Sequence, residues 1–247
     1  IGVVLFLVPT PVRIERDHPG EIRDRFNRYL AYVIALKDGK WVNFNVEAVR
    51  AGMSPYYTKY GYSRRFHNEL LAAQDEARDA KRGMWNPDPK LMKYPDYKER
   101  FEWFEARAAF MEAFRNEGKD NPSYVDLTHW DALKRLEEHV GKEVKIIGVV
   151  AEVRFAERGP SRVLLSYRMF NDFPLVFFDR DVLVQSGLPE WRGEFIVVTG
   201  TVTDYTNKKS GKRQLQIAVD RASQIRLSKV PGLPDPANPS TPTTAGP

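Results

Sequence analysis

The sequence contains no cysteine, so the chain forms no disulfide bond and offers no thiolate to a metal ion. Chains without cysteine occur in reducing and oxidising compartments alike, and the compartment therefore stays undecided. Histidine is scarce as well, and the histidines that are present follow none of the short spacings typical of metal sites. We expect most of them at the surface: His18, His67, His129 and His139.

Long apolar runs are also missing. The most apolar stretch, IGVVLFLVP at residues 1–9, has about half the length that a membrane-spanning helix needs. It is either the end of a longer apolar segment or a buried strand. Because the first residue is isoleucine rather than methionine, we expect the sequence to be a piece of a longer protein, with any targeting signal before Ile1.

Charge of one sign is only mildly in excess. Lysine and arginine total 38 and aspartate and glutamate 33, which gives a formal net charge of +5 and a pI near 9.3. Such a balance suits an anionic partner, DNA and RNA included, without requiring one. At 247 residues, the chain is long enough for two ordinary domains.

Residues 1–88 form the first predicted unit. Strands are predicted at 12–15 and 30–36, and the glycine-containing turn KDGK joins the second of these to a third strand, WVNF. A short helix is predicted over residues 45–52 and a longer one over 63–83. An asparagine and a serine are the expected N-caps of these helices, and a glycine ends each of them.

Residues 89–140 are predicted to be a helical connector, because apolar residues recur there at helical spacing. In residues 141–229 the period changes to that of strands, and five strand segments separated by turn signals favour a small closed or partly open barrel. Gly148 and Gly200 lie within two of these strands, where we expect bends that close the barrel. The Pro/Ser/Thr-rich tail, residues 230–247, is predicted to be disordered.

Four motifs of the first unit follow one another in a distinctive order. DRFNRYLAY, residues 24–32, places an Asp-x-aromatic-x-Arg step directly before a strand. It is followed by the asparagine-initiated helix ending in Arg-x-Gly at 45–52, by the tyrosine-rich loop SPYYTKYGY, and by a long helix that closes on Gly-x-Trp at 83–85. In this order, the motifs resemble the C-terminal half of the staphylococcal nuclease-like (thermonuclease) family.

The resemblance implies a metal-dependent phosphodiesterase built on a five-stranded oligonucleotide-binding barrel. In the family a carboxylate-bound Ca²⁺ ion polarises the phosphate, a glutamate assists the attacking water, and two arginines neutralise charge on the phosphate. Arg28 matches the second arginine, and its fixed fork of donors suits phosphate oxygens. Tyr60 matches a nucleotide-contacting tyrosine, while Thr58 replaces another. Arg23 and Arg25 are predicted to be plain surface charges.

The other half of the family's site has no counterpart in the sequence. Its Asp-Gly-Asp metal strand, its first arginine and its glutamate would all precede Ile1, and a barrel that lacks most of its strands cannot close. We therefore expect the N-terminal half of the domain to lie in a longer protein, and the 247-residue chain to be inactive. The alternative is a degenerate domain whose missing strands come from elsewhere.

The second barrel more loosely resembles oligonucleotide-binding (OB) folds of the tRNA anticodon-binding type, through its paired Gly-x-Val strands and its closing strand. Its basic turn, NKKSGKR, joins the last two strands, where lysines would follow a phosphate backbone. The alternative for this turn is a solvated hairpin tip. Aromatics that could stack on bases, most of them equally compatible with a place in the core, are Phe155, Tyr167, Phe170 and Tyr205. The predicted binding residues of the turn are Lys208, Lys209, Lys212 and Arg213.

The predicted fold class is α+β and mostly β: a partial nuclease-like barrel with C-terminal helices, a helical connector and a second five-stranded OB-like barrel. The predicted function is Ca²⁺-dependent phosphodiester hydrolysis of DNA or RNA by the full-length protein, with the second barrel adding affinity. The alternatives are a non-catalytic nucleic-acid-binding protein and, third, a protein-interaction scaffold. Backbone contacts carry no base information, so the choice between DNA and RNA stays open. Oligomeric state is open as well.

Overall fold

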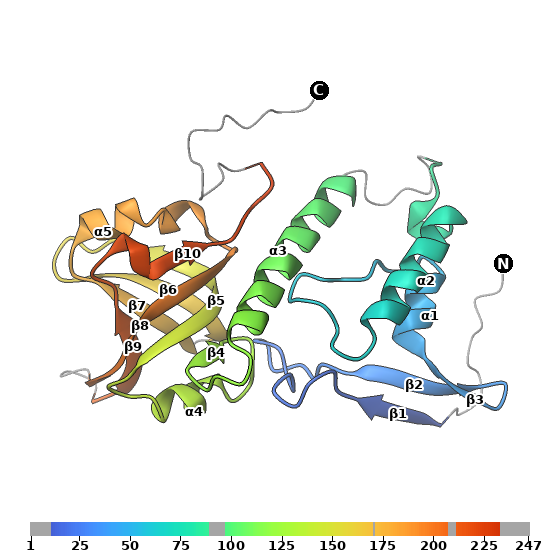
Figure 1. Cartoon of the computed structure of the whole chain (residues 1–247), viewed down its shortest axis with the longest axis horizontal. Coiled ribbons are helices and arrows are strands. Elements are labelled where there is room, and N and C mark those ends of the chain that lie inside the picture. The colour runs from blue at the N-terminus through green and yellow to red at the C-terminus, as the bar shows by residue number, and fades with distance from the viewer. Residues whose placement is uncertain (1–10, 89–96, 170, 207–210, 233–247) are drawn as a thin grey trace.

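Two β-rich units lie on either side of one long helix, α3 (Tyr97–Glu117), as Figure 1 shows. The N-terminal unit is a three-stranded sheet with two helices, and the C-terminal unit contains a closed barrel. The apolar segment at residues 1–9 and most of the Pro-rich tail lie outside the described residues. The computed structural model describes residues 11–88, 97–169, 171–206 and 211–232.

The sheet of the first unit is antiparallel, with the strand order β1-β2-β3. The predicted hairpin turn joins its second and third strands, and Asp38 and Gly39 take positive φ angles of 51° and 75° in it. The strands therefore lie close to where the sequence predicts them. Their bounds are Val12–Glu15 for β1, Tyr32–Lys37 for β2 and Lys40–Asn43 for β3.

Two helices, α1 (Phe44–Arg50) and α2 (His67–Asp79), complete the first unit. The helix α1 begins one residue after β3, and it packs against β2 and α2. A small apolar core lies between them, because each helix turns its apolar face inward. This core contains Val46, Val49, Tyr56, Leu70 and Ala73.

The N-caps of these helices differ from the prediction. Asn43, not Asn45, caps α1: its Oδ1 accepts the N–H of Asn45 at 3.0 Å and that of Val46 at 3.4 Å. The Asn45 Oδ1 instead accepts the N–H of Val33 on β2, so it ties the helix to the sheet. Ser63 lies one turn before α2 and accepts the N–H of Phe66 there at 2.9 Å.

The barrel strands of the second unit follow the order β5-β6-β7-β9-β8, and β8 pairs again with β5 to close the circle. The pair β7 and β9 is parallel, whereas the other barrel pairs are antiparallel. The short helix α5 (Arg180–Gln185) follows β7. The bounds are Glu143–Arg154 for β5, Ser161–Arg168 for β6, Asn171–Phe177 for β7, Phe195–Thr206 for β8 and Arg213–Ala218 for β9.

This five-stranded closure is the architecture of a small oligonucleotide-binding-type barrel. The predicted fold class, α+β and mostly β, is therefore confirmed. Apolar side chains that alternate along the strands fill the barrel interior. They include Val144, Ile146, Val163, Leu165, Phe173, Leu175, Ile196, Val198, Val202 and Ile217.

The predicted bends in the barrel lie next to their glycines. β5 pairs with β8 up to Val149 and with β6 from Val150 onward, and β8 changes partner from β5 to β9 after Thr201. A Cβ on Gly148 would lie 2.9 Å from the Leu127 side chain, and one on Gly200 2.5 Å from that of Ile217. Glycine is therefore needed where each strand turns and its neighbours approach closely.

The segment predicted as a helical connector also contributes a strand to the second sheet. β4 (Tyr124–Asp126) pairs in parallel with β5, and α4 (Ala132–Glu137) follows it. At the other side, β10 (Ile225–Leu227) pairs with β8. Residues 124–126 thus belong to the barrel sheet. Three short 3-10 turns lie at Gly83–Trp85, Leu188–Glu190 and Ala222–Gln224.

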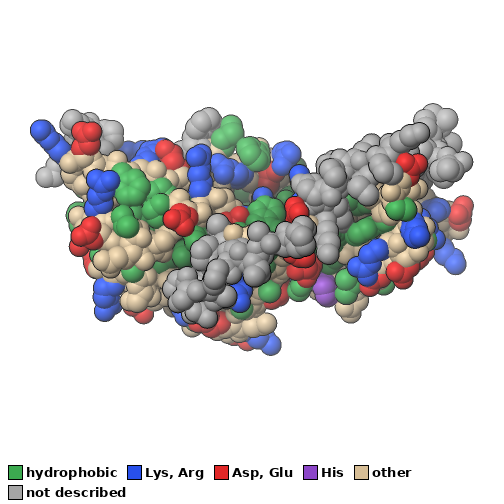
Figure 2. All heavy atoms as spheres, turned by 90° about the horizontal axis from the view of Figure 1, so that it is seen from above, with side chains coloured by type: hydrophobic (Ala, Val, Ile, Leu, Met, Phe, Trp, Pro, Cys, Tyr) green, Lys and Arg blue, Asp and Glu red, His purple; other side chains and the backbone are tan. Residues whose placement is uncertain are grey.

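The molecular surface carries charges of both signs. On the face drawn in Figure 2, Lys and Arg side chains are interspersed with Asp and Glu side chains. Side chains of one sign do not gather into a single patch among the coloured residues of this face. None of the helices in the described part of the chain combines the length and the apolar character that crossing a bilayer requires.

The helix α3 is bound to the barrel by a buried ion pair. Arg107 on α3, with a side chain only 1% exposed, donates from Nε to Glu194 Oε2 at 2.8 Å and from Nη2 to the Gly193 carbonyl. Trp103 donates its ring N–H to Glu194 Oε1 at 3.0 Å, and the Arg107 guanidinium stacks 3.7 Å from the centre of the Trp103 ring. These contacts hold the helix against the turn that precedes β8.

Replacing Arg107 by methionine is expected to lower the free energy of unfolding by about 3–5 kcal/mol, because Glu194 is then left buried without its cation. Urea denaturation of the variant measures the loss. The double variant Arg107→Met/Glu194→Leu removes both charges and is expected to recover a large part of it. A double variant that loses the sum of the two single losses would contradict the coupling.

Glu117 at the end of α3 accepts hydrogen bonds from Lys145, Tyr124 and Arg226, and the bond from Lys145 is the main cause that lowers its pKa from 4.5 to about 2. A carboxyl with a lowered pKa in the folded state stabilises the fold above pH 4.5 and loses this contribution as the pH falls toward 2. The stability of the Glu117→Gln variant is therefore expected to fall less steeply than that of the parent protein as the pH is lowered through this window.

The measurement is thermal unfolding followed by circular dichroism between about pH 5 and 2. This range covers the ordinary pKa of the glutamate, 4.5, and its pKa of about 2 in the folded protein. Glu157→Gln, an exposed glutamate in the β5–β6 loop, is the matched control and is expected to follow the parent protein. Equal pH slopes for the parent and Glu117→Gln would show that this cluster adds nothing to acid sensitivity.

Candidate functional site

Arg28, the predicted phosphate ligand, lies in a tight turn between β1 and β2. The Asp24 carboxylate closes the turn: Oδ1 accepts the N–H groups of Phe26 and Arg28 at 2.9 Å each, and Oδ2 accepts Arg28 Nε at 2.7 Å. Burial acts to raise the pKa of Asp24, but these hydrogen bonds outweigh it and lower the pKa. The Arg28 side chain is 75% exposed, so its remaining donors are accessible to an anion.

The two other arginines of this turn are not plain surface charges, which corrects the sequence prediction. Arg25 donates from Nη1 to the Ser166 hydroxyl on β6 at 2.6 Å, and its carbonyl accepts the Met169 N–H at 3.0 Å. Arg23 donates to Asn27 Oδ1 and its guanidinium lies 4.1 Å from the centre of the Tyr29 ring. The turn that carries Arg28 is therefore attached to the barrel.

Tyr60, the predicted nucleotide contact, lies in the tyrosine-rich loop between α1 and α2. The residue is 49% exposed, and its ring meets that of Phe195 edge-on at 6.1 Å between centres. It lines a pocket of about 230 Å³ together with Leu30 and Ala31, which directly follow the Arg28 turn in sequence. Thr58, in contrast, is buried against α3, where its hydroxyl lies 3.4 Å from Glu105 Oε1.

The predicted basic turn of the barrel is described only in part, because Lys208 and Lys209 lie outside the described residues. Lys212 and Arg213 line a pocket of about 390 Å³ next to α4. Arg213 forms ion pairs with Asp204 and Glu137. These predicted binding residues therefore lie in a different pocket from Tyr60.

The aromatics proposed to stack on bases have different environments. Phe155 is 44% and Tyr205 38% exposed, whereas Tyr167 is buried and donates its hydroxyl to the Trp130 carbonyl. Phe170 lies outside the described residues. Phe155 also lies 5.0 Å beneath the Arg180 guanidinium, so it combines an accessible ring with a neighbouring cation.

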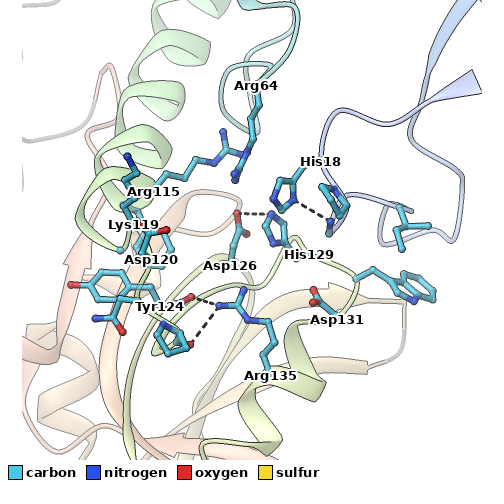
Figure 3. Close-up of a pocket in the computed structure, with 18 residues that line it drawn as sticks. His18, Arg64, Arg115, Lys119, Asp120, Tyr124, Asp126, His129, Asp131 and Arg135 are labelled. Carbon is cyan, nitrogen blue, oxygen red and sulfur yellow. Dashed lines mark hydrogen bonds and ion pairs between the residues drawn. The ribbon is translucent and has the colours of Figure 1, made fainter.

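The sequence prediction missed a second cluster of polar side chains, which lies at a cavity of about 900 Å³ lined by three of its members, His18, Asp126 and His129 (Figure 3). His18 and Glu21 follow β1, while Asp126 ends β4 and His129 lies between β4 and α4. His129 Nε2 lies 3.8 Å from Glu21 Oε1 and 3.7 Å from Asp126 Oδ2. His129 is only 6% exposed and is an exception to the expectation that most of the histidines lie at the surface.

Burial governs the ionisation of this cluster. It lowers the pKa of His18 from 6.5 to about 4, with help from nearby Arg64, and it lowers the pKa of His129 as well. It also raises the pKa of Glu21, although Arg115 opposes the change. Both imidazoles are therefore neutral near pH 7, the form in which histidine accepts a hydrogen bond or binds a metal.

Close packing holds the cluster together across the two units. The Trp130 N–H donates to the Gly20 carbonyl at 2.8 Å, and a Cβ on Gly20 would lie 2.8 Å from the Nδ1 of His129. The Gly20 N–H in turn donates to His18 Nδ1 at 3.1 Å. A glycine is thus required for the loop after β1 to reach the buried imidazole.

The described architecture defines a β-rich, two-unit protein in which a small three-stranded sheet with two helices is attached to a closed barrel. Residues 8–87, about a third of the chain, match the model of the family described as staphylococcal nuclease homologue. The predicted resemblance is confirmed for the first unit. No curated protein matches the chain.

Solved structures give further likenesses at low identity. An OBody bound to hen egg-white lysozyme is 21% identical, covers 38% of this chain and 86% of its own, and has a TM-score of 0.29. The asparaginyl-tRNA synthetase of Entamoeba histolytica is 18% identical over 35% of this chain and 21% of its own, with a TM-score of 0.27. The aspartyl-tRNA synthetase of the same organism is 17% identical over 40% of this chain and 22% of its own, with a TM-score of 0.27. The chain thus spans about a fifth of either synthetase.

The described residues do not fit the Ca²⁺ ion that the nuclease family implies. Calcium takes about six to eight oxygen ligands. Both oxygens of Asp24, the carboxylate beside Arg28, are already engaged by the turn itself. Within the described ranges, one group of three potential ligands lies within 4.8 Å, namely His18, Glu21 and His129, and two of these are imidazoles.

Substituting Gly20 by alanine is expected to lower the free energy of unfolding by about 1–3 kcal/mol, because the added methyl group overlaps the buried His129 ring. Chemical denaturation measures the change. Lys119→Ala, at the exposed wall of the same cavity, is the control and is expected to stay within about 0.5 kcal/mol of the parent. A Gly20→Ala variant as stable as the parent would contradict the close packing described above.

Proposed function

We propose that this protein binds DNA or RNA along a surface shared by both units, and that the full-length protein hydrolyses the phosphodiester backbone. In this proposal Arg28 is the phosphate-contacting residue, Tyr60 contacts a nucleotide, and the basic turn at the start of β9 adds affinity. The match of residues 8–87 to the model of a nuclease-like family supports a nucleic-acid substrate. The DNA or RNA preference is left to the experiment.

The observation that carries the proposal is the attachment of the Arg28 turn to the barrel. Arg25 in that turn donates to Ser166, and Met169 donates back to the Arg25 carbonyl. Ser166 is on the second barrel strand, β6, whose side chains alternate between buried and partly exposed. In OB folds the second and third strands form the binding face. The exposed Arg28 guanidinium therefore extends this face of the barrel with a phosphate-binding group.

The chemistry of Arg28 suits an anionic phosphate at this position. Asp24 holds the guanidinium through Nε and Nη2, which fixes its orientation before any ligand arrives. A guanidinium has further N–H donors, and charge-assisted hydrogen bonds from them to a phosphate are short and strong. In a hydrolytic reaction, these donors would stabilise the charge that develops on the phosphate oxygens.

A non-catalytic nucleic-acid-binding protein is the second candidate. It is favoured by the carboxylate beside Arg28, which is engaged by its own turn rather than left open to a cation. In this case Arg28 and the barrel bind the strand without cleaving it. Binding and cleavage assays separate the two candidates.

Binding is tested by fluorescence anisotropy with labelled single-stranded DNA and RNA at several salt concentrations. Arg28→Ala and Lys212→Ala are each expected to weaken binding and to reduce the salt slope, log Kobs against log[salt], by about 0.7 for a lost phosphate contact. Arg78→Ala, which removes an exposed arginine of α2 paired with Asp75, is the matched control with no expected change. Salt slopes that are equal for all four proteins would overturn the proposed interface.

Cleavage is tested separately, with Ca²⁺ and a chelator. The 247-residue chain is expected to bind without cleaving, whereas the full-length protein shows Ca²⁺-stimulated cleavage that Arg28→Ala abolishes. Full cleavage by Arg28→Ala would remove the catalytic assignment of this residue. Binding without cleavage by the full-length parent would instead establish the non-catalytic candidate.

A further inference from the structure

The cluster of His18, Glu21, Asp126 and His129 contains none of the residues assigned to the proposed nucleic-acid interface. His18, Asp126 and His129 line the cavity of about 900 Å³, and Glu21 lines the pocket that also contains Tyr60. Figure 3 shows the two imidazoles side by side, with the Asp126 carboxylate next to them and Arg64 and Arg115 at one side. The two rings stack with centres 4.9 Å apart. The ligand-type atoms of His18, Glu21 and His129 all lie within 4.8 Å of one another. The cluster therefore joins nitrogen and oxygen donors from both units at one point.

Three buried atoms of this cluster lack hydrogen-bond partners among the described residues: Glu21 Oε1, Asp126 Oδ2 and His129 Nε2. The His129 and Asp126 side chains are only 8% and 6% exposed. The distances from His129 Nε2 to the two carboxylate oxygens, 3.8 and 3.7 Å, are too long for hydrogen bonds. Buried polar atoms are nearly always satisfied, so an unpaired imidazole nitrogen with two unpaired carboxylate oxygens within 3.8 Å of it indicates a missing ligand at this point.

The neighbouring groups orient these atoms toward that point. Thr128 donates both its N–H and its hydroxyl to Asp126 Oδ1, at 2.8 and 2.6 Å, and thereby leaves Oδ2 directed at His129. Outer hydrogen bonds of this kind are typical supports of metal-binding carboxylates. Gly20 allows the chain carrying His18 and Glu21 to reach the buried ring.

We propose that His129, Glu21, Asp126 and His18 bind one divalent transition-metal ion of the zinc class. Neutral imidazole and carboxylate ligands suit zinc, whereas calcium and magnesium prefer oxygen alone. Zinc–ligand distances of about 2.0–2.2 Å place tetrahedral ligand atoms about 3.3–3.5 Å apart. The two separations from His129 Nε2, 3.8 and 3.7 Å, exceed this by a few tenths of an ångström, and the atoms of His18, Glu21 and His129 lie within 4.8 Å of one another, so the side chains have to move together when the ion binds.

Two features of the surroundings set the conditions of binding. The Gly20 N–H donates to His18 Nδ1, so the proton of the neutral ring lies on Nε2. Binding of a metal ion through Nε2 therefore moves this proton to Nδ1 and breaks the hydrogen bond from Gly20. Arg115 lies 3.5 Å from Glu21 Oε1, and Arg64, Lys119 and Arg135 also line the cavity. The two carboxylates balance the charge of the ion, while the cations favour an anion at any remaining coordination position.

The ion would join the two units, because His18 and Glu21 come from the nuclease-like segment and Asp126 and His129 from the barrel side. A ligand that binds only the folded state raises its stability. Zinc binding is therefore expected to raise the thermal unfolding temperature. This site differs in ligands and place from the Arg28 turn, and its test does not depend on nucleic-acid binding.

The proposal is tested by isothermal titration calorimetry of Zn²⁺ into the tag-free protein. The parent is expected to bind one ion per chain, and His18→Gln and Glu21→Gln are each expected to lose at least about tenfold in affinity. His139→Gln, which alters a histidine outside the cavity, is the matched control and keeps the parent's affinity. No binding by the parent, or equal binding by the parent and both cluster variants, would overturn the proposal.

Two measurements on the parent protein alone keep the test independent of how the variants fold. Co²⁺, substituted for Zn²⁺, is expected to give the intense visible absorption of a tetrahedral nitrogen–oxygen site, which excess Zn²⁺ removes. Zn²⁺ is also expected to raise the unfolding temperature, whereas Ca²⁺ at the same concentration leaves it unchanged. A Co²⁺ spectrum identical to that of the free aqueous ion would contradict the site.

Discussion

The buried pair of Arg107 and Glu194 is the interaction on which the arrangement of the two units depends. It fixes α3 against the turn before β8, with Trp103 donating to the same carboxylate and stacking on the same guanidinium. A buried pair of this kind is sensitive to the loss of either partner, since the remaining charge cannot be solvated. The helix therefore has one well-defined position on the barrel.

That position determines where the nuclease-like segment lies. The opposite side of α3 binds the tyrosine-rich loop through Glu105 and Arg115, so the loop is held between α1, α2 and the helix. The Arg28 turn reaches the barrel independently, through Arg25 and Ser166. These two contacts, together with that of Gly20 with Trp130, attach the first unit to the second, and both are made by elements that carry proposed binding residues.

Much of the fold follows from local patterns in the sequence. The alternation of buried and exposed side chains predicted the five barrel strands, and the glycine-containing turn predicted the hairpin of the first unit. The sequence prediction placed the N-cap of α1 at Asn45 rather than Asn43, because both asparagines are suitable caps. Only the hydrogen bond from the Val33 N–H, on the strand β2, shows that the Asn45 side chain has a different role. β4 was missed because three residues are too few to show a period.

The candidate sites were harder to predict, because their residues are distant in sequence. The histidine cluster joins His18 and Glu21 to Asp126 and His129, and no spacing rule links positions so far apart. The available signal was local and weak: each pair has a separation of three residues, which brings two ligand groups to one side of a turn. Arg25 looked like a surface charge for the same reason, since its partner Ser166 is on the other unit.

The central claim is that the two units present one continuous surface to a nucleic acid. The most direct test is hydrogen–deuterium exchange of the backbone amides, with and without a saturating single-stranded oligonucleotide. Exchange is expected to slow both in residues 23–29 and in β6, at the same oligonucleotide concentration. Protection confined to one unit, or absent from both, would contradict the account.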